Sequence, residues 1–214
     1  MLKSLFLVLF TFFASSVFAT EKYTTVEVDP LRVVSIKGEI GMNSIKIAGN
    51  IEKLADGLGG PINLVITSGG GSVAMGSQIL SAVTLAKSRG HEIRCYVPII
   101  AASMAFQVFV HCDKRYALKH TLLLWHPMKT SIRSATADML LYEGKRLQNW
   151  ERPFILDLLK SLKIPYKTFQ YHRQNETMWM AYEFNRLSPG FLTVVDDIKG
   201  VTDLFGLIDP TDDL

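Results

Sequence analysis

One stretch of the chain, residues 62–87, restricts the fold more than any other. Residues 62–67 are a continuous run rich in β-branched residues, which is typical of a strand buried on both faces. A glycine-rich turn is predicted at residues 68–72, and residues 73–87 are predicted as a helix with Gly90 behind it. Because a buried strand leading through a turn into a helix is the building unit of α/β proteins, we expect a mainly parallel sheet flanked by helices.

The same alternation continues along the chain. Further predicted elements are strands at residues 33–36, 92–97, 115–118 and 122–125, and helices at residues 44–58, 103–110 and 134–162. Hydrophobic residues make up 48% and charged residues 20% of the 214 residues, as in a single domain with a packed core. The last predicted helix is long and amphipathic, so we expect another surface to cover its apolar stripe.

The N-terminus has the pattern of a secretory signal. Lys3 precedes an apolar run at residues 5–14, which is short for a bilayer core of about 30 Å, and small residues end at Ala19. We predict cleavage after Ala19 and release to the periplasm or the medium; a retained membrane anchor is the alternative. The predicted divisions are a signal peptide at residues 1–19, an N-terminal arm at 20–31 and the main domain at 32–214.

Charge and cysteine content add two constraints. The formal net charge of +3 is too small to indicate nucleic acid or a membrane surface as a partner. Cys95 and Cys112 are the two cysteines, and in an exported protein they could form a disulfide. Two buried free thiols are the other possibility, because the sequence does not show the geometry that decides between them.

The glycine-rich segment at residues 67–73 has three possible roles. Consecutive glycines lose much backbone entropy on folding, so a structural need is expected. A phosphate cradle is one role, but the Lys-Ser/Thr that would follow it is absent. A second is close approach to a peptide, with a free N–H directed at an oxyanion. The third is a tight turn only.

A serine between small residues begins the predicted helix at residues 103–110. In the segment Ala101-Ala102-Ser103-Met104-Ala105, the hydroxyl could be exposed beside the sheet, as in an acyl-transfer elbow. The alternative is a helix-capping serine. A nucleophilic serine needs a base, and His126 ends an apolar run directly before Pro127. We expect surface or structural roles for the other histidines, which are His91, His111, His120 and His172.

Five segments, in a consistent order along the chain, resemble the proteolytic subunits of the Clp protease family. They are residues 62–71, like that family's strand and glycine turn; 95–104, around its nucleophile; 114–118, like its Lys-Arg-Phe strand; 124–127, around its histidine; and 204–209, like its C-terminal motif. The resemblance implies a crotonase-like α/β fold, with the long helix as a handle, and serine endopeptidase activity without metal or cofactor.

The resemblance also implies roles for individual residues. Ser103 corresponds to the nucleophile and His126 to the base, while Glu176 stands where the family has the aspartate of the triad. The alternatives for this acid are Asp196, Asp197 and Asp203. The N–H groups of Gly70 and Met104 would form the oxyanion hole, and a peptide substrate would contact Gly69, Gly71, Ser72 and Val73. Two departures from the family are Gly69, in place of proline, and Pro127 directly after His126.

Expected partners follow from the same resemblance. They are polypeptide substrates and further copies of the chain in a ring-type homo-oligomer. We expect neither nucleic acid nor an ATP-driven unfoldase, because an exported protein lacks that ATP supply. Three alternatives stay open: a Ser-Lys peptidase with Lys129 as base, a crotonase-type acyl-CoA enzyme, and a non-catalytic scaffold or binding subunit.

Overall fold

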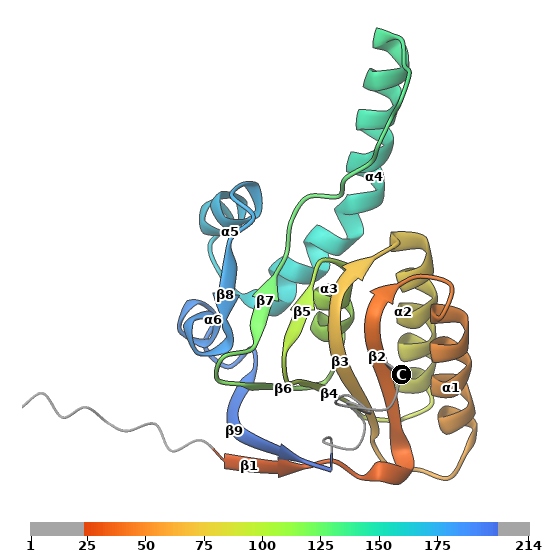
Figure 1. The fold of residues 1–214 in the computed structure, drawn as a ribbon, viewed down its shortest axis with the longest axis vertical. Coiled ribbons are helices and arrows are strands. Elements are labelled where there is room, and N and C mark those ends of the chain that lie inside the picture. Colours follow the sequence, from red (N-terminus) through yellow and green to blue (C-terminus); the bar gives the residue numbers. More distant parts are fainter. Residues whose placement is uncertain (1–23, 201–214) are drawn as a thin grey trace, which may run out of the picture.

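The computed structural model describes residues 24–200, which form one sheet flanked by helices (Figure 1). Its strands are β1 (Thr24–Glu27), β2 (Val33–Ile40), β3 (Ile62–Gly71), β4 (Ile93–Val97), β5 (Ile100–Ala102), β6 (Lys114–Leu118), β7 (Leu122–Leu124), β8 (Met178–Met180) and β9 (Thr193–Lys199). Its α-helices are α1 (Ser44–Asp56), α2 (Val73–Ser88), α3 (Met104–Val110), α4 (Ala137–Leu162), α5 (Tyr166–Gln174) and α6 (Ala181–Leu187).

The strand order is β1-β9-β6-β4-β3-β5-β7-β8, with β2 also paired to β3. Among the described strands, β7 and β8 form the one antiparallel pair, and the other neighbours are parallel. The predicted α/β fold with a mainly parallel sheet is therefore confirmed. Parallel strands place their carboxyl ends at one edge of the sheet, which is where α/β proteins build their sites.

Strand β3 is buried on both faces, as its composition predicts. Leu64 and Ile66 are fully buried in the large cluster that includes residues of α1, α2 and α3. Val65 points to the opposite face and packs with Tyr96 and Val195 in a second cluster. Because successive side chains of a strand alternate between faces, both faces of β3 contribute apolar contacts to the core.

The predicted turn at residues 68–72 is wrong, because β3 continues through Gly71. The end of β2 pairs with β3 there, with Glu39 opposite Gly70 and Ile40 opposite Gly71. Only Ser72 separates the strand from α2, and its hydroxyl caps that helix. Glycine-rich composition indicated a turn, but pairing with β2 keeps these residues extended.

The N-terminal part of the chain joins the sheet within the described range. Strand β1 pairs in parallel with β9, and Pro30–Arg32 form a short 3-10 turn before β2. The predicted arm at residues 20–31 thus contributes a strand, which its β-branched residues favour. The predicted signal peptide at residues 1–19 lies outside the described residues, as does the C-terminal motif at 204–209.

Helix α4 extends away from the sheet in Figure 1, and only its C-terminal half reaches the core. Leu158 and Leu162 are buried there. Large apolar side chains between its N-terminus and its middle are exposed, namely Met139, Leu140, Leu141, Tyr142 and Trp150. Within residues 24–200, no helix has both the length and the hydropathy needed to cross a bilayer.

A disulfide links Cys95 on β4 to Cys112, which follows α3. Both residues are buried, at 0% and 2% exposure, and their Cα atoms lie 5.9 Å apart. Of the two possibilities that the sequence left open, the structure therefore has the disulfide and not two free thiols. The bond ties the C-terminal end of α3 to the sheet, while Ser103 lies at the other end of this helix.

Candidate active site

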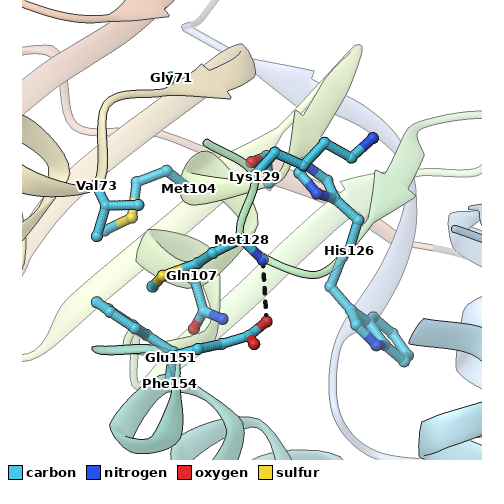
Figure 2. A pocket seen from close by; sticks show the side chains of 11 residues that line it. Gly71, Val73, Met104, Gln107, His126, Met128, Lys129, Glu151 and Phe154 are labelled. Carbon is cyan, nitrogen blue, oxygen red and sulfur yellow. Dashed lines mark hydrogen bonds between the residues drawn. The ribbon is translucent and has the colours of Figure 1, made fainter. Parts of the chain in front are cut away.

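A cavity of about 210 Å³ lies at the carboxyl ends of β3, β5 and β7, beside α4 (Figure 2). Ser103 and His126 both line it, although 23 positions separate them in the sequence. The complete lining is Gly71, Val73, Ser103, Met104, Gln107, Trp125, His126, Met128, Lys129, Glu151 and Phe154. The fold thus brings together two polar side chains from two different strand ends.

Ser103 lies in the turn between β5 and α3, with a φ of 55° and a ψ of −124°. A positive φ is uncommon for a residue with a Cβ, and it persists only where the surrounding structure imposes it. Ser103 occupies the N-cap position of α3, but its side chain makes no capping hydrogen bond. The alternative of a helix-capping serine is therefore wrong, and the hydroxyl is not used to begin the helix.

Residue 70 must be glycine because the backbone of β3 touches the Ser103 turn. Gly70 has a φ of +98°, and a Cβ there would lie 2.5 Å from the Cβ of Ser103 and 2.9 Å from the nitrogen of Met104. The N–H of Gly70 donates to Oγ of Ser68 over 3.1 Å. Met104 begins α3, where an N–H has no acceptor within the helix. Of the two predicted oxyanion donors, Gly70 thus already has a partner in this conformation.

The four predicted substrate contacts fall into two pairs. Gly71 and Val73 line the cavity, whereas Gly69 and Ser72 are not part of its lining. A Cβ at Gly71 would lie 2.4 Å from the carbonyl oxygen of Ile40, so close approach to β2 explains this glycine. Ser72 donates its N–H to the same oxygen over 2.8 Å, and its hydroxyl caps α2. Contact of these four residues with substrate stays a prediction.

His126 follows β7 and faces the cavity with a defined tautomer. Its Nδ1 lies 2.6 Å from the carbonyl oxygen of Pro127. Because a carbonyl oxygen can only accept, this bond places the ring proton on Nδ1 and leaves the lone pair on Nε2. A neutral imidazole in this form can take up a proton at Nε2.

Glu176 pairs with Lys129 in this structure. The lysine Nζ lies 2.7 Å and 2.9 Å from the two carboxylate oxygens. The hydrogen bond from Lys129 lowers the pKa of the Glu176 carboxyl, and the charges of Lys129 and of a protonated His126 act in the same direction. The carboxylate is therefore close enough to sense His126, but the partner of the imidazole N–H is the carbonyl of Pro127.

The alternative acids lie elsewhere in the fold. Asp196 and Asp197 belong to β9, which is separated from β5 by β6, β4 and β3 in the strand order. Asp196 lines a different cavity, together with Ile99 and His120. Asp203 lies outside the described residues. Within residues 24–200, no group of three or more His, Cys, Asp or Glu side chains could hold a metal ion.

The other histidines have contacts that suit structural roles. His91 is buried, and its two ring nitrogens lie 3.0 Å and 3.1 Å from the carbonyl oxygens of Gly60 and Ala55. His111 lies 2.7 Å from the carbonyl oxygen of Gln107 and 3.2 Å from a carboxylate oxygen of Asp157. These two side chains connect neighbouring elements and do not line the cavity.

The sequence interpretation missed five lining residues: Gln107, Trp125, Met128, Glu151 and Phe154. Glu151 accepts a hydrogen bond from the backbone N–H of Met128 over 3.0 Å and forms an ion pair with Arg173. Two signals could have revealed this part of the site. Gln107 is the one polar residue in the apolar segment of α3, and Glu151 occupies a position on the apolar stripe of α4.

Comparison with known proteins supports the resemblance seen in the sequence. The family model described as Clp protease matches residues 29–181, a range that includes Ser103, His126 and Glu176. No curated protein matches the chain. A match over more than half of the chain, together with the confirmed α/β fold, shows that this chain belongs to the Clp protease family.

Proposed function

We propose that the protein is an exported, ATP-independent serine endopeptidase with Ser103 as nucleophile and His126 as general base. Membership of the Clp protease family suggests serine peptidase activity. The observation that carries the proposal is that Ser103, in a strained turn and free of any capping role, shares a cavity with His126. Strained backbone of this kind is concentrated at functional sites.

The mechanism follows from the tautomer of His126. Nε2 takes the proton of the Ser103 hydroxyl while Oγ attacks the scissile carbonyl, and the imidazolium then protonates the leaving amine. Water, activated by the same nitrogen, hydrolyses the acyl-enzyme. The bond from Nδ1 to the carbonyl oxygen of Pro127 supports this order of events, because it directs the lone pair to Nε2.

The developing oxyanion needs hydrogen-bond donors beside Ser103. The N–H of Met104, at the first turn of α3, is the donor that the geometry favours most. The N–H of Gly70 lies in the adjacent segment, and it would exchange its bond to Ser68 for the oxyanion. We therefore assign Met104 the main share of this stabilisation.

An extended peptide would bind along one edge of β3. The other edge is occupied, because Gly70 and Gly71 pair with Glu39 and Ile40 of β2. On the opposite side, β5 pairs with β3 at Ser68, and the chain then turns away at Ser103. The edge of β3 that follows Ser68 is where a peptide could add. A peptide added there would place its carbonyl groups beside the nucleophile.

A Ser-Lys mechanism is the second candidate, because Lys129 also lines the cavity. Its side chain is 64% exposed and pairs with the carboxylate of Glu176. A lysine that acts as a general base is usually buried, and Lys129 is not. These contacts favour His126 as the base.

Two properties of the whole protein complete the proposal. The buried disulfide supports an oxidising compartment, and so agrees with the proposed export.

Members of the Clp protease family usually form ring oligomers that act on polypeptides. The exposed apolar side chains of α4 support self-association of this chain, which sedimentation of the protein without its signal should show as a multimer.

Labelling with a fluorophosphonate probe tests the serine mechanism directly. The wild-type protein should be labelled on Ser103, and both Ser103→Ala and His126→Ala should abolish labelling and peptidase activity. Ser81→Ala, an exposed serine on α2, is the matched control and should behave as the wild type. Wild-type activity in Ser103→Ala would refute the proposal, and a wild-type protein without label or activity would favour the non-catalytic alternative.

A further inference from the structure

The peptide group between Pro127 and Met128 is hydrogen-bonded on both sides. Its carbonyl oxygen accepts from Nδ1 of His126 over 2.6 Å. Its N–H donates to Oε1 of Glu151 over 3.0 Å, the bond that is dashed in Figure 2. Because the C=O and N–H bonds of a trans peptide point in opposite directions, His126 and Glu151 lie on opposite sides of this group. One amide therefore connects a buried carboxylate to the proposed general base.

This connection sets the direction of the carbonyl group that holds His126. A peptide group is planar and rigid, so a partner that fixes its N–H also fixes its C=O. The ring of Pro127 restricts φ to about −65°, which leaves the backbone here fewer other conformations. The bond from Met128 to Glu151 therefore also determines where the acceptor for Nδ1 of His126 lies.

Glu151 is itself held in place by Arg173 of α5. The glutamate is only 9% exposed, and the guanidinium pairs with its second oxygen, Oε2, while Oε1 binds the N–H of Met128. A hydrogen bond to a charged acceptor is stronger than one between neutral groups, and linked hydrogen bonds polarise one another where water is excluded. The carboxylate of Glu151 therefore increases the negative partial charge on the carbonyl oxygen that faces His126.

Two ion pairs surround His126, and they act on it differently. Lys129 and Glu176 form an exposed pair at the rim of the cavity, where water and salt screen their charges. Glu151 and Arg173 form a buried pair between α4 and α5. Among the described contacts, the buried pair reaches His126 through hydrogen bonds, whereas the exposed pair acts through its charge. The buried pair is therefore better placed to orient the imidazole.

We propose that Glu151 is a positioning residue for the general base. Its carboxylate orients and polarises the peptide group of Pro127 and Met128, which in turn keeps the proton of His126 on Nδ1 and the lone pair on Nε2. The same polarisation stabilises the imidazolium that forms when Nε2 takes a proton. Glu151 thus performs, through one amide, the task that a triad acid performs by direct contact. The inference rests on the proposed serine peptidase function and adds a residue to it.

Glu151→Gln tests this role, because it removes the charge and keeps an oxygen that can accept from Met128. We expect kcat and kcat/KM to fall together, with KM unchanged, since the lost interaction is strongest in the transition state. The loss should be roughly 10-fold, by analogy with metal sites where a residue orients a histidine from outside. Fluorophosphonate labelling of Ser103, which needs no peptide, should slow by a similar factor. Glu92→Gln is the matched control, because its carboxylate pairs with Arg94 outside the cavity lining.

The pH profile of kcat/KM separates this role from a purely structural one. In Glu151→Gln the carbonyl stabilises the imidazolium less, so the acidic limb of the profile should move to lower pH. Arg173→Met leaves the carboxylate on Met128 but removes the charge that neutralises it, so the same limb should move to higher pH. An ion pair that only links α4 to α5 would lower the thermal stability of both variants without these opposite shifts. Should one variant fail to fold, the direction of the shift in the other still decides.

The outcomes also separate this inference from the function on which it rests. If the wild type is labelled on Ser103 but Glu151→Gln keeps the wild-type kcat, labelling rate and pH profile, the peptidase stands and the positioning role is wrong. A raised KM with an unchanged kcat would make Glu151 a substrate contact and would equally overturn that role. If Ser103 is neither labelled nor needed for cleavage, the proposed function fails and this inference fails with it.

Discussion

Ser103 and Glu176 are both non-glycine residues with a positive φ, 55° and 46°, but their surroundings differ. The turn at Ser103 is enclosed by the backbone of β3 at Gly70 and by the buried start of α3. Glu176 follows α5, keeps 42% of its side chain exposed and is bound by Lys129. Core packing fixes the position of the serine, whereas an ion pair that water can replace holds the glutamate. The proposed nucleophile is therefore preorganised, whereas the position of the predicted acid can change when its ion pair is exchanged for water.

Gly70→Ala is expected to have the largest effect, because it tests whether core packing fixes the Ser103 turn. The added Cβ would lie 2.5 Å from the Cβ of Ser103, so the serine turn must move. We expect a loss on the order of 10²-fold in kcat/KM, since a displacement of about 1 Å at a reacting group has that effect. Gly49→Ala on the exposed surface of α1 is the control, because no atom lies within 4 Å of a Cβ there, and it should retain wild-type activity. Equal activities of the two variants would contradict the close contact between β3 and the serine turn.

Removing the disulfide should lower the stability of the whole domain and is not aimed at the Ser103 turn itself. The double variant Cys95→Ala, Cys112→Ala opens a link between residues 17 positions apart. We expect the free energy of unfolding to fall by about 3 kcal/mol, the value typical of a loop of this size. Urea denaturation with and without reductant measures this. Reductant should destabilise the wild type and leave the double variant unchanged; a wild type insensitive to reductant when unfolding is followed to completion would contradict the link.

Glu176→Gln tests the other residue of the comparison, which is held by an exposed ion pair. In the described arrangement the carbonyl of Pro127 fixes the tautomer of His126, so Glu176 contributes mainly through its charge. We expect kcat to fall by about fivefold at most, because charge interactions between exposed side chains are weak. A loss on the order of 10⁴, as found when a triad acid that holds the tautomer is replaced, would instead show that Glu176 leaves Lys129 and orients His126 during catalysis.

Lys129→Met is the matched partner variant. It frees the carboxylate of Glu176 to interact with His126, so activity should be equal to that of the wild type or higher. Loss of all activity in Lys129→Met, with the fold intact by circular dichroism, would favour the Ser-Lys mechanism over the one proposed.

The smallest expected effect is on the pH dependence of stability. The pKa of Glu176 is lowered in the folded protein, so the unfolded chain binds the proton more tightly. The stability that wild type gains over Glu176→Gln should be fully present above the ordinary carboxyl range and should disappear as pH falls through the folded pKa. Because the pair is exposed, added salt should reduce the difference as well. A difference that grows on acidification would contradict the ion pair.

The sequence predicted the frame of the protein better than its site. The run at residues 62–67 predicts a doubly buried strand because continuous β-branched residues have few other stable environments, and β3 confirms it. Local composition failed at residues 68–71, where pairing with β2 keeps glycines extended. A turn propensity is local, but strand pairing depends on residues about 30 positions away.

The sequence predicted the site residues that belong to recognisable motifs. Ser103 and His126 were chosen from their positions at element ends, and the fold places both at one cavity. The pairing of Glu176 with Lys129 could not be read from the sequence, because it depends on how the segment after His126 lies against the end of α5. Gln107 and Glu151 were overlooked because each stands alone in an apolar pattern that was taken to be core.

The pairing of β1 with β9 has a consequence for how the molecule is made. Residues 24–27 are among the first of the domain to be synthesised, yet their partner is at residues 193–199. Contacts between such distant positions raise the contact order and slow folding, because a loop of nearly the whole domain must close first. This edge of the sheet cannot be completed until residues 193–199 have left the ribosome. The order of synthesis thus delays completion of the sheet until the last strand of the domain is released.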